Sequence, residues 1–471
     1  MLFTQSIFFV FMAAVLAGLL VLRRGEHKIL WLIGAGAFFY GWWDWRFLTL
    51  LAFTATFDFH LGLAIGRAAQ PLRKRLLILD IGVNLGILCV FKYANFFLDS
   101  LSILTAPAGV SFSSLHIILP LGISFFVFEA MSYCIDIYRG NLQPYTNWRH
   151  FALFMFFFPR MIAGPIIRAA DFLPQLQRDI RVTWPNFCAG FQLFLVGLTK
   201  KLVIADNLAP FADLVFANPA QYSGGAIWQA VLAYSIQIFC DFSGYSDMAI
   251  GLARMMGFEL PANFNLPYLA TNLTEFWRRW HISLSSWLRD YLYISLGGNR
   301  RGETRTYCNL LITMILGGLW HGASWNFALW GALHGLGLCV HKLWSGFFKA
   351  RGVRSKSAAG VIIGGAASWL FTFGFVCFCW IFFRAPSFSD ALLMLNKMLG
   401  GPGMQWLSGA FLVIAPVVVV AHFAGATLQR KGLSPALDWN RFAHLVLLFS
   451  WILGIIFLRS VEISPFIYFQ F

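Results

Sequence analysis

Long apolar stretches separated by short polar turns dominate the sequence and predict a series of membrane-spanning helices. A span needs about 20 apolar residues, and the polar interruptions mark the loops between spans. Clear candidates lie near 5–22, 29–43, 47–66, 76–95, 117–138, 186–205, 226–240, 308–345 (two elements), 361–383, 408–428 and 442–459. We therefore expect an all-α polytopic membrane protein with about 11 transmembrane helices, forming one domain over residues 1–471.

Three shorter apolar segments are interrupted by polar residues, near 151–168, 241–257 and 282–297. Non-helical backbone at membrane depth persists only where protein or water shields it. The run from Phe158 to Pro165 holds two prolines and a glycine in an apolar setting. It predicts a re-entrant turn, so we expect partial helices in addition to the full spans.

The composition supports a membrane location. Hydrophobic residues make up 59% of the chain and charged residues 12%, about half the share that a soluble protein carries. The net charge of +15 falls in short clusters between apolar runs, at Arg23-Arg24, Arg73 to Arg75, Lys200-Lys201, Arg300-Arg301 and Arg351 to Lys356. Basic turns of this kind mark cytoplasmic loops beside anionic lipids, so we expect the lipid bilayer as a partner and no nucleic acid.

The first apolar run precedes its basic residues, Arg23 and Arg24. A cleaved signal peptide has the opposite order, with the basic region first. We expect a retained first helix whose N-terminus lies on the periplasmic side.

Eight cysteines are scattered singly, and no pair has the spacing of metal ligands. Cys377 and Cys379 are too close together for half of a zinc site. We interpret the cysteines as small apolar filler and expect no metal.

The run from Asp241 to Asp247 places two carboxylates, hydroxyls and a glycine directly after the span that ends at Cys240. Ionisable residues within a membrane are costly and usually functional, so Asp241 and Tyr245 are candidates for substrate or donor binding. A structural role is equally open, in which Asp241 and Asp247 cap a helix and pair with a nearby arginine.

Residues 276–293 have helical spacing, which predicts that Trp277, His281 and Ser285 share one face, with Arg278 one turn before the histidine. An interfacial helix whose arginines reach lipid headgroups is the alternative. That alternative explains the arginines better than it explains a histidine among apolar neighbours.

A second histidine motif surrounds His321 with glycine and tryptophan inside an apolar run, and His334 follows 13 residues later. A neutral imidazole accepts a proton near neutral pH, as a general base must. On one unbroken helix the two histidines would be roughly 20 Å apart and on different faces. Unless the helix breaks, only one belongs to a given site, and we favour His321.

Taken together, these runs resemble the membrane-bound O-acyltransferase superfamily, in its bacterial polysaccharide branch. The resemblance covers about residues 120–335 and is carried, in order, by Gly122 to Gly140, Phe158 to Ile166, Asp241 to Asp247, Asn263 to Tyr268, Phe276 to Ser285, Trp287 to Tyr293 and Gly318 to Ala323. One departure is Arg160, where we expect a less charged residue, which leaves the role of that motif in donor binding open.

The resemblance implies a ring of helices around a thinned membrane centre with a central tunnel, in the bacterial inner membrane. It makes His321 the catalytic histidine and places His281 near the same tunnel. It also implies acetyl-CoA as the cytoplasmic donor, no permanently bound cofactor, and a periplasmic partner protein that places the acetyl group on a polymer hydroxyl.

From residue chemistry we expect His321 to be the base and His281 to orient the acceptor or supply a proton. The other candidate substrate or donor residues are Trp277, Trp320 and Trp325 lining the tunnel, and Arg278, Arg289 and Lys200-Lys201 holding the anionic donor. Asp290 completes the set, although we favour a structural pair with Arg289.

Two other functions remain open. A related protein class transfers D-alanine from a carrier protein to teichoic acid, and a polytopic transporter also uses broken helices with buried Asp and His. Alginate, bacterial cellulose and other exopolysaccharides all remain candidate acceptors.

Overall fold

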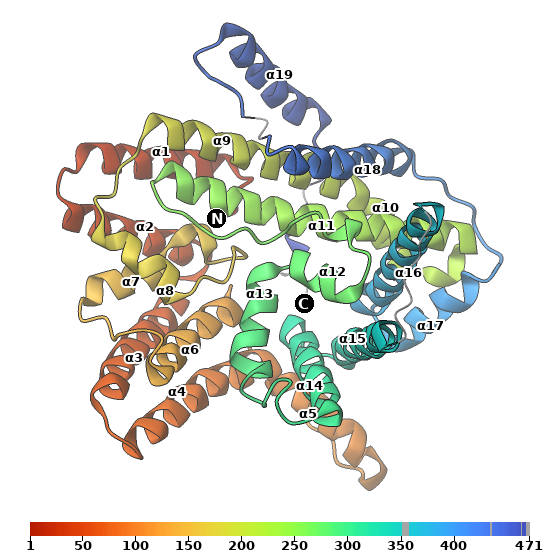
Figure 1. Ribbon diagram of the computed structural model, residues 1–471, viewed down its shortest axis with the longest axis horizontal. Coiled ribbons are helices and arrows are strands. Elements are labelled where there is room, and N and C mark those ends of the chain that lie inside the picture. Colours follow the sequence, from red (N-terminus) through yellow and green to blue (C-terminus); the bar gives the residue numbers. More distant parts are fainter. Residues whose placement is uncertain (351–357, 434–435, 463, 468–471) are drawn as a thin grey trace. The chain divides into compact units, whose positions relative to one another are not determined.

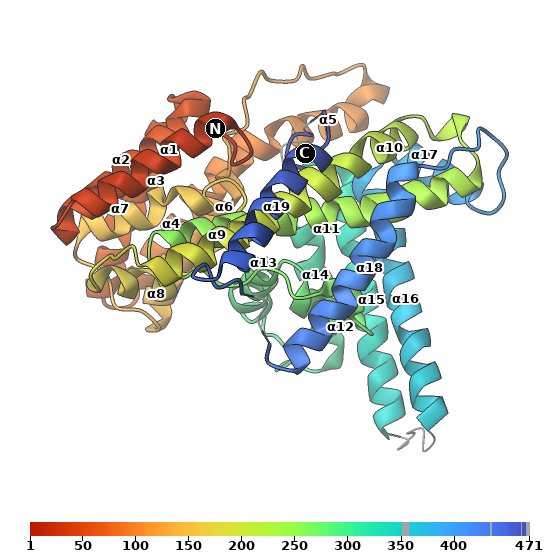
Figure 2. The same cartoon turned by 90° about the horizontal axis from the view of Figure 1, so that it is seen from above.

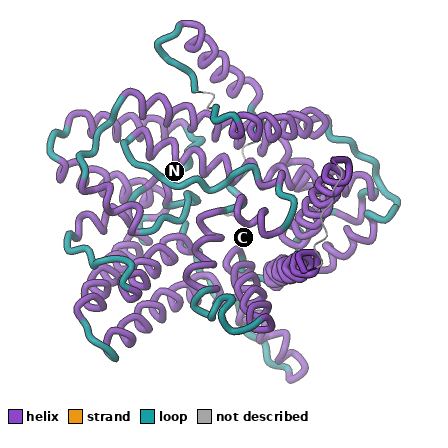
Figure 3. The backbone as a smooth tube through the Cα atoms, in the orientation of Figure 1, coloured by secondary structure: helices purple, strands orange, loops and turns teal. Residues whose placement is uncertain are grey.

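The computed structural model describes residues 1–350, 358–433, 436–462 and 464–467. Within these residues the chain is helical and forms no strand, apart from an isolated bridge between Tyr222 and Met404 (Figure 3). The all-α prediction is therefore confirmed. The basic run from Arg351 to Lys356 lies outside the described residues.

The described chain forms two compact units, the first made of residues 1–194 and 246–261 and the second of 195–245 and 262–471. In unit 1 the helices follow the order α1 (Ser6–Val21), α2 (Gly25–Asp44), α3 (Phe47–Arg67), α4 (Leu72–Leu88), η1 (Cys89–Tyr93), α5 (Ala94–Thr105), η2 (Ala106–Ala108), α6 (Ile123–Arg139), α7 (Trp148–Phe156), η3 (Phe158–Arg160), α8 (Ala169–Phe172), η4 (Leu173–Gln177) and most of α9 (Trp184–Leu198). Among them, α3 packs against both α4 and α6.

Unit 2 begins at the end of α9 and contains the histidine motifs. Its elements are η5 (Thr199–Ala205), α10 (Asp206–Ala217), η6 (Pro219–Gln221), most of α11 (Gly224–Met255), η7 (Pro267–Leu269), α12 (Leu273–Arg279), α13 (Ile282–Trp287), η8 (Leu288–Tyr293), α14 (Glu303–His321), α15 (Trp325–Ala350), α16 (Ala358–Arg384), α17 (Phe388–Lys397), α18 (Gly409–Arg430) and α19 (Phe442–Leu458) (Figure 1). Figure 2 shows α15 and α16 running side by side.

Several helices are long and apolar enough to cross a membrane, in agreement with a polytopic protein. Five segments meet both conditions among the described residues: Phe47–Arg67, Leu72–Ala108, Trp184–Ala217, Ile362–Arg384 and Gly409–Arg430. Two shorter apolar helices, α1 and α19, were also expected as spans. The total of about 11 spans stays a prediction, as do the ring, the tunnel and the single domain.

Two predicted element boundaries were wrong. The segment 241–257 is not a separate, interrupted element, because α11 runs through it without a break. The span expected from residue 117 begins only at Ile123. Pro120 precedes that start, and Gly122 has a φ of +68°, a conformation that ends the extended chain and suits glycine.

The expected re-entrant motif forms a short turn of helix at Phe158–Arg160 followed by irregular backbone, and residues 157–167 are buried. Arg160 forms an ion pair with Glu129 of α6, and its guanidinium lies 4.4 Å from the Phe154 ring centre. The other Glu129 oxygen accepts a hydrogen bond from the Ile167 main chain at 3.0 Å. The charge of Arg160 is thus used inside unit 1.

Candidate functional site

The helix expected over residues 276–293 breaks at His281. Helix α12 ends at Arg279, and His281 has a φ of +42°, in the left-handed region, before α13 begins. Trp277 and Ser285 therefore lie on different helices, and the prediction that they share one face with His281 was wrong. A left-handed residue other than glycine is strained, and such strain persists only where neighbouring structure holds it.

The loop that holds this break is the run from Asn263 to Tyr268. The Ile282 amide donates to the Asn263 carbonyl, and the Asn265 amide donates to the Arg279 carbonyl, both at 2.9 Å. The Asn263 side chain also accepts a hydrogen bond from the Ser283 hydroxyl at 2.9 Å. These bonds come from residues about 15 to 20 positions away, so helical periodicity gave no signal of them.

The start of α12 is fixed by its own capping residues. Asn272 accepts a hydrogen bond from the Glu275 amide at 2.9 Å, and the Glu275 carboxylate accepts one from the Thr271 amide at 2.9 Å. This reciprocal arrangement satisfies amides that a helix start leaves without partners. Arg279 pairs with Glu275 at 2.8 Å, whereas Arg278 is exposed.

The second histidine lies at the end of α14, in a tight hairpin with α15. A Cβ added to Gly318 would lie 2.2 Å from the Phe327 carbonyl oxygen, and one added to Gly331 would lie 2.2 Å from that of Met314. Only glycine allows the two backbones to approach this closely. The glycines of the motif therefore set the position of His321 relative to α15.

His281 and His321 come together, as the family resemblance implies. Their ring centres are 6.3 Å apart, and Trp320 lies 6.0 Å from His281 and 5.1 Å from His321. His281 is fully buried, and His321 and Trp320 are each 4% exposed. Phe242 of α11 packs edge-on against His281 at 4.5 Å.

His334 joins the same group because the helix breaks at residues 322–324 and the chain turns back. The Trp330 ring lies 5.1 Å from His321 and 4.8 Å from His334. His334 is fully buried, and neither of its nitrogens has a hydrogen-bond partner among the described residues. We refer to His281, Trp320, His321, Trp330 and His334 as the histidine cluster.

Trp277, one of the predicted lining residues, contacts this cluster at His334, with ring centres 5.1 Å apart. Trp325 does not belong to it, because it begins α15 and is 65% exposed. Sequence reasoning did not select Trp330. Its position five residues after Trp325 indicates nothing until the hairpin fold is known.

Asp241 has a different partner from the one expected. It lies inside α11 rather than at a cap, and it pairs with Lys201 of η5 at 2.7 Å instead of with an arginine. Lys201 also contacts Asp206 at 2.8 Å and donates to the Ser464 carbonyl at 2.8 Å. The ammonium group is thus surrounded by two carboxylates and a main-chain carbonyl, so we expect Lys201 not to bind an anionic donor. We call Lys201, Asp206 and Asp241 the buried triad.

The triad holds a C-terminal segment beside the cluster. The second Asp241 oxygen accepts a hydrogen bond from the Ile467 main chain at 2.8 Å. The adjacent Phe466 is 2% exposed and packs against Tyr245 at 4.9 Å and Phe242 at 5.9 Å. Tyr245, a predicted substrate residue, is therefore buried under this segment, and Phe242 connects the segment to His281.

Arg289 and Asp290 form an ion pair at 2.6 Å, as the structural interpretation expects. The arginine side chain is 64% exposed, so its outer face remains accessible. Both residues lie in the π-helical segment η8, directly after α13.

Comparison with known proteins identifies the family of the chain. A sequence model of the membrane-bound O-acyltransferase family matches residues 145–383. A probable alginate O-acetylase of Pseudomonas putida is 40% identical over the full length of both chains. A peptidoglycan O-acetyltransferase of Helicobacter pylori is 35% identical over 94% of this chain and 91% of its own. A teichoic acid D-alanyltransferase of Streptococcus thermophilus is 32% identical, over 48% of this chain and 57% of its own.

Proposed function

The chain belongs to the membrane-bound O-acyltransferase family, and from that premise we propose that it transfers an acetyl group to hydroxyls of an extracytoplasmic polysaccharide. The donor is a cytoplasmic thioester, acetyl-CoA, and the enzyme acts from the bacterial inner membrane. A periplasmic partner protein completes the delivery to alginate, cellulose or a similar exopolysaccharide.

The choice of acetyl group and acceptor rests on where the relatives align. The relatives that align over nearly the whole chain include a probable alginate O-acetylase and a peptidoglycan O-acetyltransferase, which by their names acetylate polymers built of sugars. The D-alanyltransferase aligns with less than half of the chain. This difference favours acetylation over D-alanyl transfer.

The observation that carries the mechanism is the buried pair of imidazoles at His281 and His321. A hydroxyl attacks a thioester efficiently only if a base removes its proton as the new bond forms. We assign that base to His321. The hydroxyl oxygen bonds to the acetyl carbon, the carbon–sulfur bond breaks, and the proton taken by His321 passes to the departing thiolate.

The second imidazole stabilises the charge that develops during this attack. As the carbonyl carbon becomes tetrahedral, its oxygen becomes negative, and a donor in a buried site stabilises it more strongly than water would. We assign this role, or the orientation of the acceptor hydroxyl, to His281. The strained backbone at this residue is consistent with a side chain held in one fixed direction.

The anionic donor needs positive charge where it enters. Arg278 and Arg289 are exposed and lie on the segments that flank His281. A guanidinium binds phosphate through two parallel hydrogen bonds. We assign these two arginines to the donor and leave Lys201 to the buried triad.

The test measures acetyl ester on the polymer produced by host cells that carry His321→Ala, His281→Ala or wild type. His422, a buried histidine outside the histidine cluster, is 6% exposed and serves as the matched control. We expect His321→Ala to lose acetylation by at least about 100-fold, the usual contribution of a general base, at normal membrane expression and polymer yield. His422→Ala should retain most of it.

Full acetylation by His321→Ala would refute the assignment of the base. Membrane vesicles supplied with labelled acetyl-CoA test the donor separately, because label should enter the polymer only from the cytoplasmic side. Normal acetylation in cells that lack the whole protein would instead favour a transport function.

A further inference from the structure

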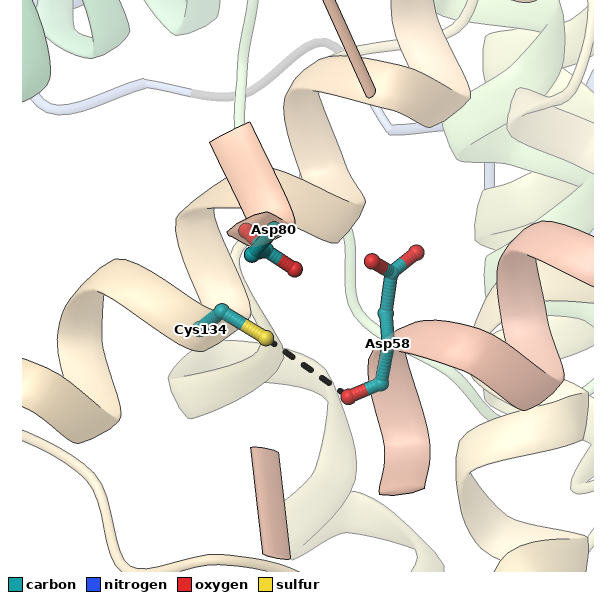
Figure 4. A group of neighbouring side chains, drawn as sticks. All are labelled: Asp58, Asp80 and Cys134. Atoms are coloured by element: carbon teal, nitrogen blue, oxygen red, sulfur yellow. Dashed lines mark hydrogen bonds between the residues drawn. The ribbon is translucent and has the colours of Figure 1, made fainter. Parts of the chain in front are cut away.

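A second group of buried polar side chains lies in unit 1, outside the histidine cluster. Asp58 of α3, Asp80 of α4 and Cys134 of α6 meet where these three helices pack together (Figure 4). Each is 0% exposed. One oxygen of each carboxylate and the cysteine sulfur lie within 4.8 Å of one another. The two aspartates belong to segments with the length and hydropathy of membrane spans.

The hydrogen bonds in this group leave most carboxylate oxygens unsatisfied. The Asn84 amide donates to Asp58 Oδ1 at 2.9 Å, and the Cys134 thiol donates to the Asp58 main-chain oxygen at 3.5 Å. Asp58 Oδ2 and both oxygens of Asp80 accept no hydrogen bond from an amide, a lysine or an arginine among the described residues, and the two carboxyl groups and the Cys134 thiol face one another. Figure 4 shows the two side chains and the cysteine sulfur around a common space.

No lysine or arginine in the described part of the chain forms an ion pair with Asp58 or Asp80. An ionised carboxylate buried without a cation costs several kcal/mol, and the cost is greater at membrane depth. The arrangement therefore contrasts with the buried triad of unit 2, where Lys201 forms ion pairs with both aspartates.

We propose that Asp58, Asp80 and Cys134 bind a divalent cation of the zinc class. Carboxylate and thiolate are both ligands for Zn²⁺, and a sulfur ligand disfavours the harder Mg²⁺ and Ca²⁺. Binding releases the proton of the Cys134 thiol to solvent and leaves a thiolate–metal bond.

The spacing is compatible with such a cation. Three atoms that are all within 4.8 Å of one another share a point no farther than about 2.8 Å from each, whereas zinc bonds are about 2.0–2.3 Å long. Each ligand atom then needs to move by less than about 1 Å. The Asn84 carbonyl oxygen, which has no hydrogen-bond partner among the described residues, or a water molecule can supply the fourth ligand.

Such a site would be structural. The three ligands come from three helices of unit 1, so the cation would connect α3, α4 and α6 at one point. Cysteine spacing along the sequence indicated no metal site, because a single cysteine acquires its partners only through helix packing. The proposal does not depend on the acetyl-transfer reaction.

The first test is the metal content of wild-type protein purified in detergent without chelators, followed by titration with Zn²⁺ alone. We expect about one zinc per chain, retained through gel filtration, as for a structural zinc site. This measurement requires no variant to fold. Failure to bind zinc under these conditions overturns the proposal.

Variants then locate the site. Cys134→Ser and Asp80→Asn should lose the zinc. Asn84→Ala should lower the affinity for zinc by about 10–100-fold, as is usual for a residue that hydrogen-bonds to a ligand. Cys379→Ser, at another fully buried cysteine, is the matched control and should keep it. If Cys134→Ser and Asp80→Asn both retain zinc as wild type does, the proposal is wrong. It is also wrong if Asp80→Asn folds more stably than wild type in the absence of metal, because that result indicates two carboxyl groups that share a proton. Metal content is read without measuring acetylation, so failure of the proposed function leaves this test intact.

Discussion

Replacing Lys201 by methionine removes the single cation of the buried triad and leaves an unbranched side chain that is one atom shorter. Lys201 lies 2.8 Å from Asp206 and 2.7 Å from Asp241, and all three residues are at most 4% exposed. Breaking a buried ion pair by removing one partner costs about 3–5 kcal/mol. Without the lysine, a buried carboxylate could instead become neutral by taking up a proton. For a carboxyl with the ordinary pKa near 3.9, this protonation costs about 4 kcal/mol at pH 7, which agrees with that range.

A loss of this size is measurable as thermal stability in detergent. For a folded unit the size of unit 2, 1 kcal/mol corresponds to roughly 2 °C in Tm, so Lys201→Met should lower Tm by about 6–10 °C. Lys200→Met is the matched control. Lys200 is adjacent, only half-buried, and lies 5.6 Å from the Phe239 ring centre, a contact that contributes about 0.5–1 kcal/mol.

The double variant Lys201→Met with Asp241→Asn separates charge from shape. It leaves one buried carboxylate instead of two, so it should recover part of the lost Tm. If Lys201→Met lowers Tm no more than Lys200→Met does, the triad does not stabilise unit 2 and this reasoning is wrong.

Two further predictions concern other contacts. Gly318→Ala should separate α14 from α15, because its Cβ would lie 2.2 Å from a carbonyl oxygen. We expect the free energy of unfolding to fall by about 1–3 kcal/mol and the acetyl ester content of the polymer to decrease. Gly346→Ala, with open space around its Cβ, should change neither the Tm nor the acetyl ester content. Arg160→Met should lower the free energy of unfolding by about 3–5 kcal/mol, and adding Glu129→Gln should restore much of that loss. Tm values of the two single variants and the double variant test this prediction. Additive losses in the double variant would contradict it.

The helices themselves could be predicted from sequence because apolar length is a local property. The spans at α3, α16 and α18 follow their apolar runs closely. The same reasoning failed at His281, where the helical spacing of Trp277 and Ser285 suggested one face. The break depends on hydrogen bonds from Asn263, which local periodicity cannot reveal.

The residues of the candidate site could be predicted where a local motif marks them, and not where their contacts depend on helix packing. His281 and His321 were chosen from their motifs, and their rings do lie together. His334 was set aside on the condition that its helix is unbroken, and that condition fails at residues 322–324. One of the two open interpretations of Asp241 paired it with an arginine, but its partner Lys201 comes from a neighbouring segment that only helix packing could identify.

The attachment of residues 464–467 to the buried triad has a consequence for biosynthesis. Lys201 and Asp241 are translated more than 200 residues before Ser464 and Ile467, the segment whose main chain they bind. Until the ribosome has made that segment, the lysine lacks its third acceptor and Phe466 is absent from its position beside Tyr245. The surroundings of His281 are therefore completed only late in translation, after most of the helices have been made. A nascent chain halted at α19 would contain the histidine cluster without the segment that packs beside Phe242 and Tyr245.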